Sequence, residues 1–322
     1  MSDRDPLHRS IPPNAAPEFY YPGLSPQLLA RVKQLWSAQA LDFDRHWHHA
    51  IRELSSFCAV PRVDIAATSA EVDLVFLFDQ CLIWTRALHS AARLGLDHTV
   101  EGLTADQWHG LAALSARLTE QLSALRLLAL NDLPMPAMQI ARSISEDVDM
   151  ALVLLMRPKL ARRFAECRDV EEASDFWRRH IAGGRAYRTI SETLYSVGVD
   201  HSADTDYAKW RKQVLTILGA AVHSNALSVD VPERRVGAVL LNDDSLHFAT
   251  FRLHELCAYS LLVKPDLPEV LQGAVASAAG KPGTSGQLAE LAGPLSSILI
   301  SQIASLATPA SPVEPHRTAA HV

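Results

Sequence analysis

The residues with the clearest potential for chemistry are Arg142 and Glu146, in the apolar segment AMQIARSISEDVDMALVLLM. Their spacing places the guanidinium and the carboxylate one turn apart on one helical face, which Asp149 shares, so that Arg142 could serve both carboxylates. Ile144 and Val148 flank the pair, and burying an unpaired charge is costly. The pattern predicts a structural ion network, which we favour, or a substrate or partner site. If Arg142 is buried, removing Glu146 would cost about 3 to 5 kcal/mol.

A second polar group falls near the end of a later helix, in GAAVHSN, where His223 is followed by Ser224 and Asn225. A histidine titrates near neutral pH and is therefore a candidate general acid or base. The structural alternative is a cationic histidine favoured by the helix C-terminus, with asparagine in a left-handed cap. The candidate catalytic residues are Arg142, Glu146 and His223, and the candidate binding residues are Asp149, Ser224 and Asn225.

A third pattern, DFDRHWHHAIRE, places Asp42, His46, His49 and Glu53 along one stripe of the first long helix. His46, His49 and Glu53 are weak candidates for metal ligands, because one straight helix cannot surround a metal ion and no Glu-x-x-His partner is found in the sequence. A solvated helix face is the favoured interpretation. We expect no metal and no cofactor.

Several familiar motifs are absent from the sequence. The segment HELCA lacks the second histidine of a zinc-protease helix, and GKPGTSG lacks the Walker order of glycine, lysine and hydroxyl. Neither G-x-S-x-G nor G-x-G-x-x-G is found. The net charge of −6 gives no strong signal for nucleic acid.

The periodicity of apolar residues predicts an all-α fold, a multi-helix bundle with a small β-hairpin insertion near 235–251 around an Asn-Asp-Asp turn. An irregular N-terminal arm (1–24) precedes a helical domain (25–279), which is followed by a linker and C-terminal helix (280–307) and a disordered tail (308–322). The core helices are expected at about 26–59, 69–94, 105–130, 137–156 and 204–224.

Local signals set the expected helix boundaries. Gly95 is a candidate C-terminal cap, Thr104 and Gln107 form a potential capping box, and the segment LPMP is expected to break the chain before the Arg142 helix. The segment VDLVFLFDQCLIW is apolar nearly all round, which predicts the central helix of the core. In the helix over 204–224 the expected buried stripe is Tyr207, Trp210, Val214, Ile217 and Ala221.

The compartment is predicted from the cysteines and the termini. The four cysteines lie far apart without a C-x-x-C pair, as reduced thiols of a cytoplasmic protein would, and the polar start of the chain shows no signal peptide. The uncharged stretch Leu291–Leu306 is diluted by proline, serines and glutamine. We expect it to cover the core or to form a homo-oligomer rather than to cross a membrane.

The segments ARSISED and AVHSNALSV, separated by a helix-rich stretch, carry a resemblance to an uncharacterised bacterial family, a domain of unknown function. In that family an Arg-Ser-x-x-Glu helix precedes a later helix with a histidine and a small hydroxylated residue. The resemblance covers about 134–259. It implies an all-helical fold and marks Arg142, Glu146 and His223 as family positions, without implying an activity.

Two functions remain open from the sequence. The first is a ligand-binding or protein-interaction module with a polar Arg/Glu/His cluster, its partner unknown. The second is a metal-independent hydrolase of RNA or another phosphoester, in which Arg142 stabilises phosphate charge, His223 is the general acid or base and Glu146 orients one of them. Helical prokaryotic ribonucleases are an analogy, but the candidate residues do not form their Arg-x4–6-His signature. The distance from His223 to the ion pair would distinguish the two functions.

Overall fold

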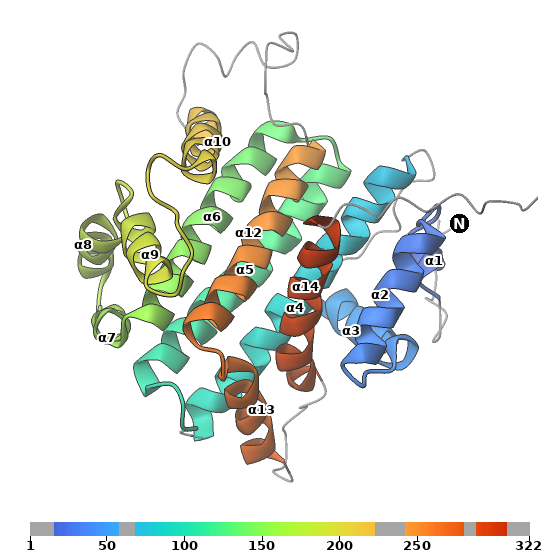
Figure 1. Cartoon of the computed structure of the whole chain (residues 1–322), viewed down its shortest axis with the longest axis horizontal. Coiled ribbons are helices and arrows are strands. Elements are labelled where there is room, and N and C mark those ends of the chain that lie inside the picture. Colours follow the sequence, from blue (N-terminus) through green and yellow to red (C-terminus); the bar gives the residue numbers. More distant parts are fainter. Residues whose placement is uncertain (1–15, 58–67, 99, 223–241, 280–287, 308–322) are drawn as a thin grey trace, which may run out of the picture.

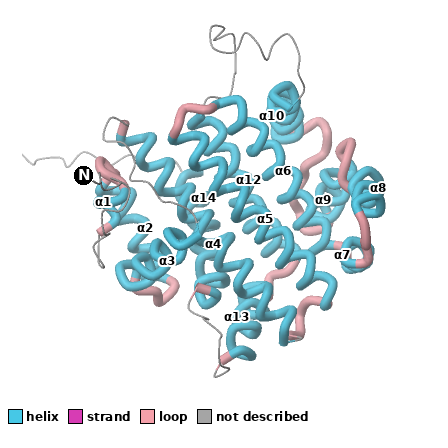
Figure 2. The backbone as a smooth tube through the Cα atoms, turned by 180° about the vertical axis from the view of Figure 1, so that it is seen from behind, coloured by secondary structure: helices cyan, strands magenta, loops and turns pink. Residues whose placement is uncertain are grey.

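The computed structural model describes residues 16–57, 68–98, 100–222, 242–279 and 288–307 (Figure 1). All regular secondary structure in these ranges is helical, which confirms the all-α class (Figure 2). A short 3-10 turn, Ala289–Leu291, precedes the last helix. In chain order the α-helices are α1 (Pro17–Tyr20), α2 (Pro26–Ala38), α3 (Phe43–Phe57), α4 (Ser69–His98), α5 (Ala105–Leu130), α6 (Pro134–Met156), α7 (Pro158–Ala165), α8 (Val170–His180), α9 (Arg185–Tyr195), α10 (Asp206–Val222), α12 (Asn242–Val263), α13 (Leu267–Ala278) and α14 (Ala292–Ala307).

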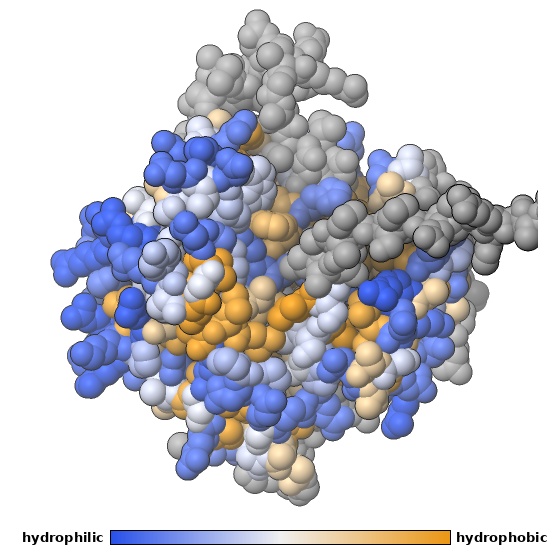
Figure 3. Space-filling model, viewed as in Figure 1, coloured by the Kyte–Doolittle hydropathy of each residue, from blue (hydrophilic) through white to orange (hydrophobic). Residues whose placement is uncertain are grey.

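The long helices α4, α5, α6 and α12 pack side by side through the centre of the bundle (Figure 1). Helix α4 contributes fully buried side chains on several faces, among them Phe76, Leu82 and Ile83, as expected for a central helix. Helices α1 to α3 flank one side of the bundle and α7 to α10 the other (Figure 1). The surface over α7, α8 and α10 is mainly hydrophilic (Figure 3).

Two helix boundaries in the middle of the bundle test the local sequence signals. The capping box at the start of α5 is confirmed, with Gln107 N donating to Thr104 Oγ1 at 3.2 Å and Thr104 N donating to Gln107 Oε1 at 3.1 Å. Gly95, in contrast, lies inside α4 rather than at its end. A Cβ atom at Gly95 would lie 2.6 Å from the Trp108 ring, so this glycine allows α4 and α5 to approach closely.

The prediction of one helix over 26–59 was wrong, because α2 and α3 are separate helices. Ala40 between them has a left-handed backbone with φ of 57°. Asp42 then starts the second helix by accepting a hydrogen bond from Arg45 N through Oδ1 at 3.2 Å. The break lets Trp36 and Phe43 pack edge to face, 5.1 Å between ring centroids.

The structure does not support the predicted β-hairpin. Residues 242–251 of that segment form the first half of α12, while 235–241 lie outside the described residues. The buried side chains Leu246, Ala249 and Leu253 recur at helical spacing. A short run of apolar residues does not by itself distinguish a strand from a buried helix, and an Asn-Asp-Asp sequence suits a helix start as well as a turn.

The ends of the chain are described in part. Tyr20 and Tyr21 of the predicted arm are buried, while 1–15, the linker 280–287 and the tail 308–322 lie outside the described residues. Helix α14 packs against α2, α4, α12 and α13, and its apolar side chains described up to Ile300 pack within the main hydrophobic core. No described helix is both long and apolar enough to span a membrane. A homo-oligomer through α14 stays a prediction.

Helix α10 is attached differently from the central helices. Three of its buried apolar residues, Val214, Leu218 and Ala221, belong to a small cluster with residues of α6 and α12 that is separate from the main core. The predicted stripe was partly wrong, because Trp210 is 39% exposed and Arg211 is buried instead. The observed orientation of α10 therefore points an arginine into the molecule.

Candidate functional site

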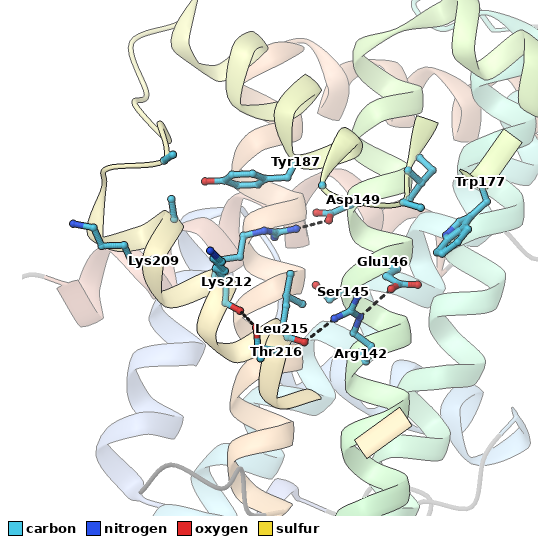
Figure 4. A pocket seen from close by; sticks show the side chains of 17 residues that line it. Arg142, Ser145, Glu146, Asp149, Trp177, Tyr187, Lys209, Lys212, Leu215 and Thr216 are labelled. Atoms are coloured by element: carbon cyan, nitrogen blue, oxygen red, sulfur yellow. Dashed lines mark hydrogen bonds and ion pairs between the residues drawn. The ribbon is translucent and has the colours of Figure 1, made fainter. Parts of the chain in front are cut away.

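A cavity of about 570 Å³ lies between α6, α8, α9 and α10 (Figure 4). Helix α6 contributes four residues, three of which belong to the predicted polar face, and α10 lies opposite with Arg211 and Lys212. Trp177 of α8 and Tyr187 of α9 supply aromatic surface. The residues contributed by α6 are Arg142, Ser145, Glu146 and Asp149.

Arg142 and Glu146 form the predicted ion pair, with Arg142 Nε 2.9 Å from Glu146 Oε1. Arg142 also donates a hydrogen bond from Nη1 to the main-chain oxygen of Leu215 at 2.7 Å, which ties α6 to α10. The two side chains are 30% and 34% exposed, so the pair is only half-buried. The pair therefore belongs to the wall of the cavity rather than to the core.

Asp149 binds two other arginines instead of sharing Arg142. Arg211 donates to Asp149 Oδ2, and Arg252 donates to Asp149 Oδ1 at 2.5 Å. Arg252 also forms an ion pair with Glu255 one turn further along α12. The two carboxylates and the two guanidinium groups balance in formal charge, and all four residues are buried. They join α6, α10 and α12 in one network.

Tyrosines complete the network on the side of Glu255. Tyr207 and Tyr259 both donate their hydroxyl groups to Glu255 Oε1, the second at 3.2 Å. Burial, and next the charge of Glu255, raises the pKa of both tyrosines, which keeps them neutral donors. The ring of Tyr187 lies under the guanidinium of Arg211 at 4.7 Å.

His201 borders the network through its ring nitrogen Nε2, 2.6 Å from the Tyr259 hydroxyl. Its ring stacks on Tyr207, with 4.2 Å between centroids. The Tyr259 proton is directed to Glu255, so the geometry fits a neutral His201 that donates from Nε2. Burial lowers the pKa of His201, in agreement with a neutral ring.

Two groups of the cavity wall have no protein partner among the described residues. Ser145 is 1% exposed, and its hydroxyl forms no hydrogen bond with the described part of the chain. Lys212 lies on the exposed face of α10 and takes part in none of the ion pairs within the described ranges. Lys209 is paired loosely with Asp206 at 3.8 Å. Ser145 and Lys212 are thus the polar groups available to a bound molecule.

The cavity continues into two neighbouring hollows. Glu146 and Trp177 also line a hollow of about 430 Å³ beside Arg117 and a hollow of about 500 Å³ beside Gly219. Three spaces therefore meet at these two side chains. Trp177 is partly exposed, so its indole ring forms a partition at the surface rather than part of the core.

The remaining candidates from the sequence are not among the described residues of the cavity wall. His223, Ser224 and Asn225 lie outside the described residues, as does the side chain of Glu53. His46 Nδ1 lies 2.6 Å from the Asp42 main-chain oxygen in its own helix. Among the described residues no group of three or more His, Cys, Asp or Glu side chains is placed to hold a metal ion.

Sequence reasoning missed most of the network beside the cavity. Arg252 and Glu255 stand one turn apart in an otherwise apolar segment, the same signal that singled out Arg142. Arg211 was missed because the expected stripe of α10 placed Trp210 inward. Comparisons of the chain with protein-family models, curated protein sequences and solved structures gave no match. Function is therefore inferred from the geometry and charges of the cavity.

Proposed function

We propose that this chain is a small-molecule-binding protein whose ligand occupies the cavity between α6, α8, α9 and α10. Its volume of about 570 Å³ lies within the range of roughly 300 to 1,000 Å³ that is typical of ligand sites. Apolar and aromatic side chains, among them Trp177, Ile181 and Leu215, alternate with a few polar groups in its wall. This composition is typical of sites for small organic molecules.

The observation that carries the proposal is the hydroxyl of Ser145. A buried polar group nearly always has a hydrogen-bond partner, and leaving one unpaired costs about 1 to 3 kcal/mol. Ser145 lines the cavity between Asp149 and Arg142 along α6, so a molecule in the cavity can supply the partner (Figure 4). A water molecule can supply it too, and binding must therefore be measured directly.

The charge network beside the cavity supports a binding role. Asp149, Arg211, Arg252 and Glu255 neutralise one another and link three helices, which fixes the position of the wall before a ligand arrives. A wall held in place loses less conformational entropy on binding. The same pairing leaves these groups little freedom to transfer protons.

The alternative of a metal-independent hydrolase with Arg142, Glu146 and His223 stays a prediction. Arg142 and Glu146 lie together but are hydrogen-bonded to each other, and Arg142 is also bonded to a main-chain oxygen. Those bonds favour a positioning role over catalysis. His223 lies outside the described residues, so no distance to the pair supports the alternative.

Binding can be tested with the uncharged fluorescent probe N-phenyl-1-naphthylamine. We expect saturable binding to the full chain, weakened by about tenfold in the variant Thr216→Trp, whose new ring fills the mouth of the cavity. Gln213→Trp is the matched control, because Gln213 is exposed on α10 and does not line the cavity. Equal binding by wild type and Thr216→Trp, with both proteins folded by circular dichroism, would refute the proposal.

A further inference from the structure

The formal charges of the side chains in the cavity wall do not sum to zero. Four are cationic and two are anionic, and two ion pairs, Arg142 with Glu146 and Arg211 with Asp149, account for both carboxylates. The lysines Lys209 and Lys212 remain, both on the first half of α10. Of the two, only Lys209 has an acidic partner within the described ranges, and that pair is loose and exposed. The cavity therefore carries an excess of positive charge.

The start of α9 adds to this charge. Gly183 and Gly184, both with positive φ, line the cavity immediately before the helix, and Gly184 is its N-cap. The N-terminus of an 11-residue helix carries partial positive charge and main-chain N–H groups that favour an anion. The helix terminus does not define a site by itself, but it faces the same space as Lys212 and the unpartnered Ser145 hydroxyl.

Another part of the wall is apolar. Trp177 lies in α8, Ile181 directly follows that helix, and Leu215 lies in α10. Trp177 lies across the cavity from the lysines in Figure 4, beside Glu146. A ligand that fits both parts needs an apolar, preferably flat, body and one acidic group.

We propose that the ligand is an amphipathic organic anion, its acidic group bound by Lys212 and the Ser145 hydroxyl near the start of α9, and its apolar body packed on Trp177. This inference rests on the proposed function and names the class of molecule that the cavity takes. Lys212 is flexible and solvated, so it attracts the acid group, and Ser145 is the fixed donor that orients it.

Two fluorescent probes with the same skeleton test the role of charge. The probe 8-anilino-1-naphthalenesulfonate carries a sulfonate, and N-phenyl-1-naphthylamine lacks it. We expect wild type to bind the sulfonate about tenfold more tightly than the neutral probe, and added salt to reduce that preference. Lys212→Gln should weaken binding of the sulfonate far more than binding of the neutral probe and so remove most of the preference, whereas Lys212→Arg should retain it.

Controls separate this inference from the proposed function. Lys159→Gln removes an exposed lysine from α7, outside the cavity, and should leave both affinities unchanged. Ser145→Ala should weaken the sulfonate more than the neutral probe. If Lys212→Gln leaves the preference intact, or weakens both probes equally, the anion proposal is wrong while the cavity remains a binding site. If Thr216→Trp affects neither probe, the binding function itself is wrong.

Discussion

The bundle contains two buried charge networks that differ in what lies beside them. In the first, Arg126 on α5 makes two hydrogen bonds to Asp79 on α4, at 2.8 and 2.9 Å, and Tyr21 donates its hydroxyl to Asp79 at 2.6 Å. All three residues are at most 1% exposed, and none lines any of the three spaces described above. In the second, Asp149 and Arg211 form part of the cavity wall.

The contrast shows that a charge in an apolar helix is not in itself a sign of function. Asp79 is fully buried in the central helix α4, yet its partners close around it and form a structural link between α4 and α5. Asp149 is also bound by two arginines, but one of them, Arg211, lines the cavity. The adjoining cavity, rather than the burial of charge, distinguishes the candidate site.

The network of Tyr21, Asp79 and Arg126, which borders none of the described cavities, is called the sealed network below. The largest effect is expected from Arg126→Met, which breaks it. Asp79 would be left as a buried charge without its main partner, and the free energy of unfolding should fall by about 3 to 5 kcal/mol, measured by urea denaturation. The triple variant Tyr21→Phe, Asp79→Leu, Arg126→Met should recover most of the loss because no charge remains buried. A loss below about 1 kcal/mol in Arg126→Met would show that water reaches Asp79.

A smaller loss, about 1 to 2 kcal/mol, is expected from Arg211→Met in the network beside the cavity. Asp149 keeps its hydrogen bond to Arg252, and the cavity gives water access to the vacated position. The same urea titrations compare this variant with Arg126→Met. Equal losses in the two variants would remove the distinction between a sealed and an open network.

Glu146→Ala should cost only about 0.5 kcal/mol, since both partners of this pair are about one-third exposed. The larger loss expected from the sequence applied to a buried Arg142, and that condition is not met. Arg142 also keeps its hydrogen bond to the Leu215 main-chain oxygen. Thermal and urea unfolding of wild type and Glu146→Ala both measure this loss of stability. A loss as large as that of Arg126→Met would contradict the half-buried geometry.

His201 should give the network beside the cavity a weak dependence on pH below 6.5. Burial lowers the pKa of folded His201 from its ordinary value of 6.5. Below pH 6.5 the unfolded chain therefore binds more protons than the folded chain, and the free energy of unfolding falls as the pH falls. The stability of His201→Gln should fall less over this range. Identical pH profiles of the two proteins would exclude a contribution from His201.

Ser145→Ala should have the smallest effect on folding, with stability unchanged or slightly raised. The hydroxyl has no partner among the described residues, so its removal takes away an unpaired polar group rather than a hydrogen bond. Urea titration of the ligand-free protein checks this result. A clear loss of stability would show that the hydroxyl is bonded within the fold.

Features set by neighbouring residues were predictable from the sequence. The capping box of α5 and the central place of α4 follow from a few adjacent residues and a continuous apolar run. The helix break at Ala40 was missed, because alanine favours the helix and the cause is the packing of the aromatic rings beyond it. The supposed strand at the start of α12 was an ambiguous run of apolar residues.

The candidate site could be predicted only in part. Arg142 and Glu146 were found because one helix presents both, and their spacing fixes their distance. The partners of Asp149 come from α10 and α12, 62 and 103 residues further along the chain, and no local pattern specifies that meeting. A small error in the rotation of α10 was enough to hide Arg211.

Helix α10 is held by a small apolar cluster that is separate from the main core, and this bears on how the proposed ligand would enter and leave the cavity. Three buried apolar residues of α10 belong to the small cluster with α6 and α12, so lifting this helix breaks that cluster and a few polar links while the main core stays intact. Local opening of this kind requires less free energy than global unfolding. One wall of the cavity can therefore open locally while the main core stays folded, which gives the proposed ligand a route of exchange.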